Sequence, residues 1–251
     1  MDSSSSLLRL DGLTKCFGKF VAVHDLSFAV SGGEIVGLLG PNGAGKTTTI
    51  RCITSILQPS AGRILIGGHD IVTQTEAAKR ELAYVPEVPS PYDMLTVMEH
   101  LRFVAAAYDR EDEMARAEEI LRRLDLWEKR HELGLNLSKG MKQKLACACA
   151  FIHCPRIYCF DEPLIGIDPK GARELKDMLA ERRAAGDAVL VSTHMLDTAE
   201  RLCDRVIIMH RGEVVAQGTM EELHARLAMG TGATLEDMFL RLTEEGAAGP
   251  T

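Results

Sequence analysis

The stretch Gly40-Pro41-Asn42-Gly43-Ala44-Gly45-Lys46-Thr47-Thr48 decides the fold of this 251-residue chain. It matches the pattern G-x-x-x-x-G-K-[ST] at every fixed position, with an apolar run at residues 34–39 before it and a helical pattern after it. Glycines let backbone N–H groups close around phosphate oxygens, and a helix start adds partial positive charge. Lys46 supplies a full positive charge to the β and γ phosphates, and the Thr47 hydroxyl suits Mg²⁺. An ordinary glycine-rich turn is the alternative, which the strand–helix setting disfavours. The stretch therefore predicts a nucleoside triphosphate site with Mg²⁺.

Two adjacent acids, Asp161 and Glu162, follow the apolar run at residues 157–160. At the carboxyl end of a buried strand, Asp161 is placed to hold Mg²⁺ through water. Glu162 can polarise the water that attacks a phosphate. Two acids at this position can instead serve only solubility, and the pair alone does not separate these readings. Beside the phosphate-binding loop, we expect the pair to complete a hydrolytic site.

The alternation of short apolar runs with helical patterns predicts an α/β fold, a P-loop core with a mostly parallel sheet. The strands of this core are expected at residues 34–39, 157–160, 188–192 and 206–209, and its helices at residues 169–183 and 195–202.

The first part and the middle of the chain have other patterns. Residues 7–13, 22–30 and 63–66 predict antiparallel strands, and residues 97–108, 111–124 and 138–152 predict helices. We therefore expect residues 1–86 and 156–230 to form a nucleotide-binding core with an N-terminal antiparallel β subdomain, residues 87–155 to form an inserted helical subdomain, and residues 231–251 to form a short C-terminal helix with a frayed tail at 245–251.

Composition limits the partners and the compartment. Lys and Arg number 29 against 36 Asp and Glu, a net charge of −7, which argues against a nucleic-acid partner. No run approaches the roughly 20 apolar residues of a membrane helix, and the N-terminus lacks a signal-peptide pattern. Seven cysteines without framework spacing fit a reducing compartment. Cys147 and Cys149, two apart on a predicted helix, are expected to be inert buried thiols rather than zinc ligands.

A second motif is Leu137-Ser138-Lys139-Gly140-Met141, followed by Gln143. Ser138 suits a helix N-cap, and a helix start with Gly140 nearby can cradle a phosphate. The motif resembles the Leu-Ser-Gly-Gly-Gln signature of the ATP-binding cassette (ABC) ATPases and lies 23 residues before Asp161. With the phosphate loop and the acids, the resemblance covers residues 7–243. It implies that Ser138, Lys139, Gly140 and Met141 contact ATP held by the partner in a head-to-tail dimer.

Four further positions resemble family motifs. Asp168 stands at the acidic position of the D-loop, a cross-dimer contact, and His194, 33 residues after Asp161, stands where the family contacts the γ-phosphate. Phe17 resembles the aromatic residue that stacks on adenine, although such a ring can also be core. Glu87 replaces the usual glutamine and still offers oxygen to Mg²⁺. Further departures are Lys139, Met141 and Ile165.

The resemblance implies an ATP-hydrolysing, Mg²⁺-dependent subunit of an ABC transporter. It works as a homodimer or a heterodimer with a paralogue, and it drives a separate transmembrane permease gripped near residues 87–96. Glu87, the variant signature and the tail at residues 235–240 resemble the ABC-2 exporter branch. The subunit would be cytoplasmic and peripheral on the inner face of the cell membrane. The alternatives are a soluble ABC ATPase outside transport and a non-hydrolysing cassette that senses ATP.

Overall fold

A six-stranded sheet forms the centre of the protein. The structure is a computed structural model. It describes the backbone of residues 6–227 and 233–247, and side chains as far as residue 242. The strand order is β10-β9-β3-β8-β7-β6, in which neighbours run parallel except β10, which is antiparallel to β9. The strands are β3 (Ile35–Leu39), β6 (Leu82–Val85), β7 (Ile157–Asp161), β8 (Ala188–Thr193), β9 (Arg205–His210) and β10 (Glu213–Gly218).

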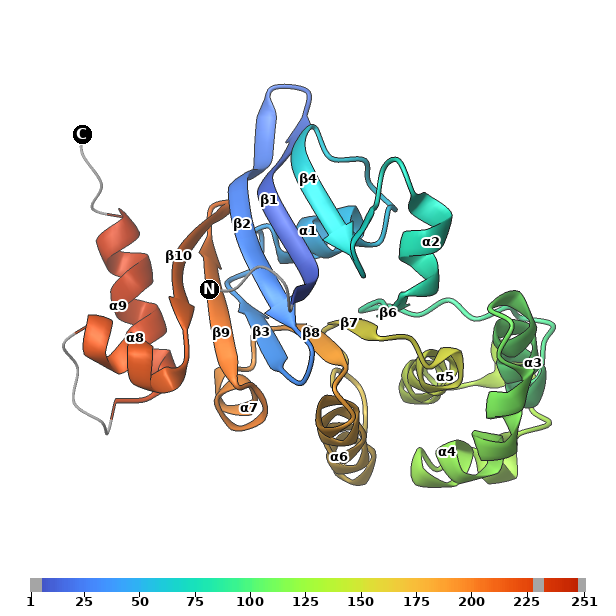
Figure 1. The fold of residues 1–251 in the computed structure, drawn as a ribbon. Coiled ribbons are helices and arrows are strands. Elements are labelled where there is room, and N and C mark those ends of the chain that lie inside the picture. The colour runs from blue at the N-terminus through green and yellow to red at the C-terminus, as the bar shows by residue number, and fades with distance from the viewer. Residues whose placement is uncertain (1–5, 228–232, 248–251) are drawn as a thin grey trace.

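An antiparallel sheet of order β2-β1-β4-β5 lies above the central sheet (Figure 1). Its strands are β1 (Ser6–Phe17), β2 (Phe20–Ser31), β4 (Ala61–Ile66) and β5 (His69–Asp70). Helix α1 (Lys46–Ile53) lies between the two sheets, and its Ile50 and Ile53 are fully buried against side chains from both. Helix α2 (Thr75–Arg80) precedes β6. Apolar burial between these layers fixes where α1 begins, and so where the phosphate-binding loop lies.

Helices cover the other face of the central sheet. Figure 1 shows α5, α6 and α7 beneath the sheet, with α3 and α4 at the end of the molecule beyond β6. Ser138 caps α5 by accepting from the Met141 amide at 3.3 Å, and Asp168 caps α6 by accepting from the Gly171 amide at 2.9 Å. The helical elements are α3 (Val97–Ala107), η1 (Glu111–Arg116), α4 (Ala117–Arg123), η2 (Trp127–Lys129), η3 (Gly134–Asn136), α5 (Lys139–His153), α6 (Pro169–Ala184) and α7 (Leu196–Leu202).

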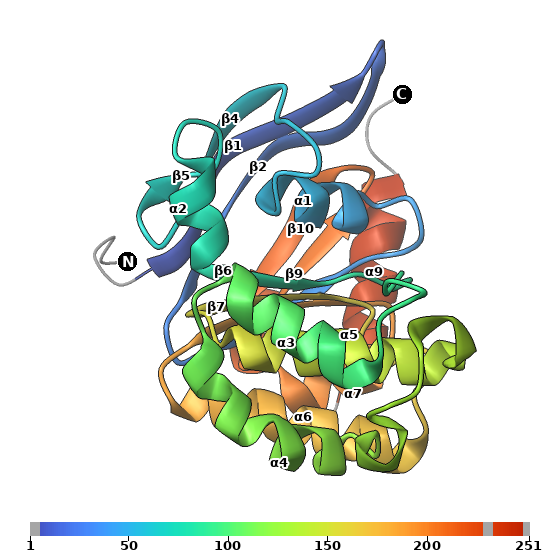
Figure 2. The same cartoon turned by 90° about the vertical axis from the view of Figure 1, so that its right-hand side faces the viewer.

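The C-terminal part packs on the β9–β10 edge of the sheet. Helices α8 (Met220–Arg226) and α9 (Leu235–Ala247) lie there side by side in Figure 1, and Figure 2 shows α9 behind the central sheet. Leu235 and Met238 are fully buried in a cluster with Ala199 of α7 and Ile208 of β9. In the part of the chain that the structure describes, no helix has the length and apolar character needed to cross a bilayer.

The predicted α/β fold is confirmed, with differences in detail. The helix expected at residues 111–124 is a 3-10 turn, η1, followed by α4, with Arg116 (φ −95°, ψ −2°) at their junction. Strands β6 and β10 were not expected: β6 has four residues, and β10, with six, lies at the edge of the sheet with mostly exposed or half-buried side chains. Helix α9 continues to Ala247, so residues 245–247 are helical rather than frayed, and residues 248–251 lie outside the described residues. The division into subdomains at 86/87, 155/156 and 230/231 stays a prediction.

Candidate active site

The sheet brings the predicted site residues to one edge. Strands β3, β7 and β8 are parallel neighbours, so their carboxyl ends meet there. Asp161 is the register partner of Ser192, and Leu39 is the partner of Thr193. A cavity of about 380 Å³ opens at this edge. It is lined by Phe17, Phe20, Ala22, Asn42, Gly43, Ala44, Gly45, Lys46, Thr47, Thr48, Glu87, Glu162 and His194.

The phosphate-binding loop joins β3 to α1. Gly45 has a φ of +104°, and a Cβ there would lie 2.8 Å from the carbonyl oxygen of Ala22, so only glycine fits. Lys46 is 6% exposed, and its ammonium donates to the carbonyl oxygens of Gly40 at 2.7 Å and Pro41 at 3.2 Å. Burial lowers the pKa of Lys46, and the carboxylates of Glu162, Asp161 and Glu87 oppose that shift. The loop therefore holds a buried cation at the floor of the cavity.

Asp161 ends β7 as a buried carboxylate, 1% exposed. Its Oδ1 accepts from the Thr47 hydroxyl at 3.4 Å and, in a short contact, from the Ser192 hydroxyl. The two residues expected to serve Mg²⁺, Thr47 and Asp161, thus lie together although 114 positions separate them. Sequence reasoning did not single out Ser192. Its hydroxyl, two positions before His194 at the end of an expected strand, is the feature that could have pointed to it.

Glu162 and His194 form a hydrogen-bonded pair. His194 Nδ1 lies 2.7 Å from Glu162 Oε1, and because the carboxylate accepts, Nδ1 carries the proton. Glu162 has a φ of +50°, unusual for a residue with a side chain, and its amide donates to the Ser192 carbonyl oxygen at 3.0 Å. Its Oε2 is buried and accepts from no group in the described part of the protein. The pair presents an oriented carboxylate with one spare acceptor beside the phosphate-binding loop.

Phe17 and Glu87 lie at the rim of the same cavity. Phe17 ends β1 and is 47% exposed, so it is not a core residue. Glu87 follows β6 and is exposed. Phe20, which also lines the cavity and is 66% exposed, was not a predicted site residue.

The signature residues are placed elsewhere. Among the described residues that line the cavity, Ser138, Lys139, Gly140, Met141 and Asp168 do not occur. Gln143 of α5 donates from its amide to the Pro86 carbonyl oxygen at 3.5 Å, one residue before Glu87 at the rim of the cavity. The chain therefore separates two groups of predicted ATP contacts.

Cys147 is buried as expected and Cys149 is half-buried, and neither thiol has a reactive environment. Burial raises the pKa of the Cys149 thiol to about 12 and also raises that of Cys147. A thiol with so high a pKa is protonated at neutral pH and is a poor nucleophile or metal ligand.

The donor set fits a magnesium nucleotide. The glycine cradle, the buried Lys46 ammonium and the helix start of α1 suit phosphate oxygens. The Thr47 hydroxyl and the Asp161 carboxylate offer the oxygen ligands that Mg²⁺ prefers. Fold and site together define a P-loop nucleotide-binding protein.

Comparison with known proteins narrows this class. A family model described as "ABC transporter" matches residues 23–165. The chain is 40% identical over 244 residues to the ABC-type transporter ATP-binding protein EcsA of Bacillus subtilis (strain 168), covering 96% of this chain and 98% of the relative. It is 38% identical over 214 residues to the SkfA peptide export ATP-binding protein SkfE of the same organism, covering 83% and 87%.

A solved structure agrees with these relatives. The protein titled "Structure of ATP binding subunit of ABC transporter" superposes with a TM-score of 0.91 at 39% identity, over 95% of this chain and all of that one. The chain therefore belongs to the ABC transporter family, as an ATP-binding subunit, and its fold is one that binds ATP. The resemblance inferred from the signature is confirmed at this level. The individual site roles stay predictions.

Proposed function

We propose that this chain hydrolyses ATP with Mg²⁺ to drive a separate membrane permease, most simply an exporter. The observation that carries the hydrolytic part is the His194–Glu162 pair, 2.7 Å apart, in the same cavity as Lys46. A cassette that only senses ATP has no need of a carboxylate oriented in this way.

Glu162 acts as the general base. Its carboxylate accepts a proton from water as the water oxygen bonds to the γ-phosphorus and the bond to the β,γ-bridging oxygen breaks, giving ADP and phosphate. His194 fixes the carboxylate through Nδ1, and its Nε2 would contact the γ-phosphate. Lys46 and the loop amides neutralise charge on the phosphates.

Thr47, Asp161 and Glu87 would hold Mg²⁺. When bound, the metal ion neutralises charge on the phosphate oxygens. Ser192 positions Asp161 through its hydroxyl, so that the carboxylate keeps one orientation. Glu87 is exposed at the rim and would reach the site from the end of β6, the strand beside β7.

Two chains would close on two ATP molecules. Ser138, Lys139, Gly140, Met141 and Asp168 lie outside the cavity of their own chain, which is the arrangement expected of residues that serve the partner's nucleotide. The exposed start of α5 presents its free amides outward. A second copy of this chain or a paralogue would fit this arrangement.

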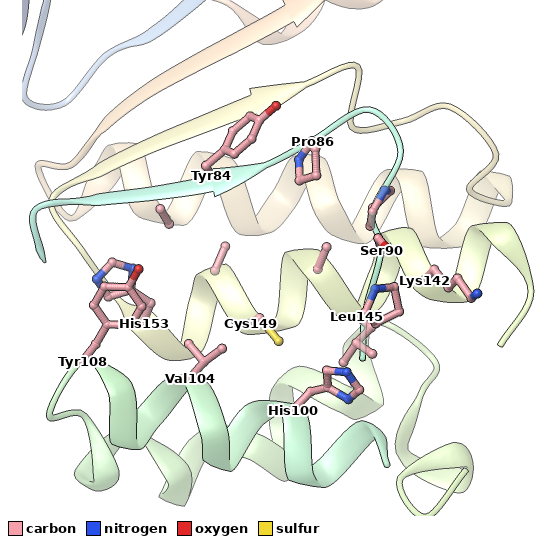
Figure 3. Close-up of a pocket in the computed structure, with 15 residues that line it drawn as sticks. Tyr84, Pro86, Ser90, His100, Val104, Tyr108, Lys142, Leu145, Cys149 and His153 are labelled. Atoms are coloured by element: carbon pink, nitrogen blue, oxygen red, sulfur yellow. The ribbon is translucent and has the colours of Figure 1, made fainter. Parts of the chain in front are cut away.

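The permease would dock beside the helical insert. A groove of about 280 Å³ runs between the segment after β6 and helices α3 and α5, and Figure 3 shows apolar side chains such as Val104 and Leu145 along it. Exposed apolar side chains occur on the neighbouring surface: Val88, Tyr92, Met94 and Phe103. Such a patch is typical of a protein interface. It coincides with the expected contact at residues 87–96, and it would place the chain on the cytoplasmic face of the membrane.

The direction of transport rests on similarity alone. One relative carries peptide export in its name, and the variant signature points the same way. We therefore propose export, with the transported molecule chosen by the permease.

Replacing Glu162 by Gln tests the hydrolytic proposal. Glutamine keeps the size of the side chain but removes the base, so turnover falls on the order of 10²–10⁴-fold while ATP affinity is retained. Glu128, exposed on η2, gives the matched control Glu128→Gln, which leaves both unchanged. Phosphate release and nucleotide binding measure the two effects. Near-normal turnover in Glu162→Gln would exclude this base.

A further inference from the structure

Phe20 is a large apolar side chain that lies exposed at the protein surface. It begins β2 and is 66% exposed, which leaves a large apolar surface in water. Its register partner is Phe17, across the turn formed by Gly18 and Lys19. Directly opposed residues of an antiparallel pair point to the same face. The two rings therefore share one face of the hairpin.

That face belongs to the nucleotide cavity. Phe20 and Ala22, two positions apart on β2, both line it, while Val21 between them does not. The Ala22 carbonyl lies against Gly45 of the phosphate-binding loop, where a Cβ would be 2.8 Å away. Two residues along a strand advance about 7 Å. Strand β2 thus runs from the phosphate end of the cavity to an aromatic end.

One side of the Phe17 ring is already covered. The Lys15 ammonium lies 5.1 Å from the ring centroid and is held there by donating to the Gln58 carbonyl oxygen at 2.8 Å. A planar base can therefore stack on Phe17 only at the opposite face of the ring. Phe20 stands next to it on the same hairpin face, with its ring free to contact the base or its edge.

We infer that Phe20 is a second base-contacting residue, which together with Phe17 forms a two-ring platform for the nucleotide base. This rests on the proposed nucleotide site at Lys46. The platform offers aromatic and apolar surface, so Phe20 contributes affinity for the base and nothing for the phosphates.

Calorimetric titration of the full chain with ADP and with inorganic pyrophosphate, each with Mg²⁺, separates base from phosphate binding. Loss of one stacking ring weakens binding of a base about five- to tenfold. We expect Phe20→Ala to weaken ADP binding by that factor and to leave pyrophosphate binding within about twofold of the parent. Phe20→Trp, which keeps a stacking ring, restores ADP affinity. Because Phe20 is exposed, these variants should fold, which their melting temperatures check.

Val21→Ala is the matched control. Val21 is 44% exposed on the same strand but on the opposite face, so its replacement should change neither affinity. Lys46→Ala should weaken both ligands; if it weakens neither, the nucleotide site itself is misplaced. If Lys46→Ala acts as expected but Phe20→Ala leaves ADP affinity unchanged, or weakens pyrophosphate equally, the inference about Phe20 is wrong. A Phe20→Ala defect confined to ATP-driven dimerisation would equally overturn it.

Discussion

The ammonium of Lys144 lies 2.5 Å from the carboxylate of Asp168 and joins the signature helix α5 to the start of α6. Lys144 is 7% exposed, and Asp168 also accepts from the Gly171 amide at 2.9 Å. The hydrogen bond from Lys144, followed by that from Gly171, holds the pKa of Asp168 down at about 2. Asp168, which is expected to contact the partner's ATP, thus also holds α5 against the start of α6 within its own chain.

Asp168→Ala should destabilise the protein by about 2–3 kcal/mol, because it removes an N-cap and leaves the buried Lys144 unpaired. The value lies below that of a fully buried pair, since Asp168 is half exposed and water screens it. Asp168→Asn should lose less, because the amide oxygen still accepts from Gly171. Urea unfolding at pH 7 measures the free energy of unfolding of both variants. Equal losses of stability in the two variants would contradict the prediction that Asp168→Asn loses less.

The same pair predicts an acid transition. The pKa of Asp168 is lower in the folded protein than its ordinary value of 3.8, so its stabilisation is present above about pH 4. It is lost as the pH falls through the folded value of about 2. The difference in unfolding free energy between the parent and Asp168→Asn should therefore shrink across this window, and a constant difference would contradict the shift.

His153 predicts a second pH effect, at milder acidity. It is 3% exposed, stacks on Tyr108, and donates from Nε2 to the Arg80 carbonyl oxygen at 3.1 Å. Burial, with a smaller effect of the Arg110 charge, lowers its pKa from 6.5 to about 4. Between pH 6.5 and pH 4, His153 is protonated in the unfolded chain but not in the folded protein. The free energy of unfolding therefore falls by about 1.4 kcal/mol per pH unit across this range.

The measurement is urea unfolding at pH 7 and pH 5. Between these values the parent should lose about 2 kcal/mol more than His153→Gln, in which this group no longer titrates. His131→Gln, at an exposed histidine, is the control and should follow the parent. If both variants lose as much as the parent, His153 is not the acid-sensitive group.

The contiguous motifs explain why much of the site could be predicted from sequence. The loop at residues 40–48 is one continuous motif, and Asp161 and Glu162 directly follow an apolar run that reads as a buried strand. Phe20, Ser192 and Lys144 were missed because their importance comes from contacts across 3, 31 and 24 positions that only the fold creates. Strand β6 was missed since four apolar residues do not distinguish a strand from a short helix.

Gly140 is a signature residue that the packing of its own chain also requires to be glycine. The resemblance assigned it to phosphate binding across a dimer, yet a Cβ there would lie 2.4 Å from the carbonyl oxygen of Gly166. Because that contact is with backbone, Gly140→Ala must push the loop before α6 away from α5, at a cost of about 1–3 kcal/mol. Lys139→Ala, at the exposed neighbouring position, should leave stability within about 0.5 kcal/mol of the parent. Thermal and urea unfolding of the free chain, without nucleotide, compare the two. A Gly140→Ala chain as stable as the parent would mean that glycine is required there only for the partner's nucleotide, and not for packing within the chain.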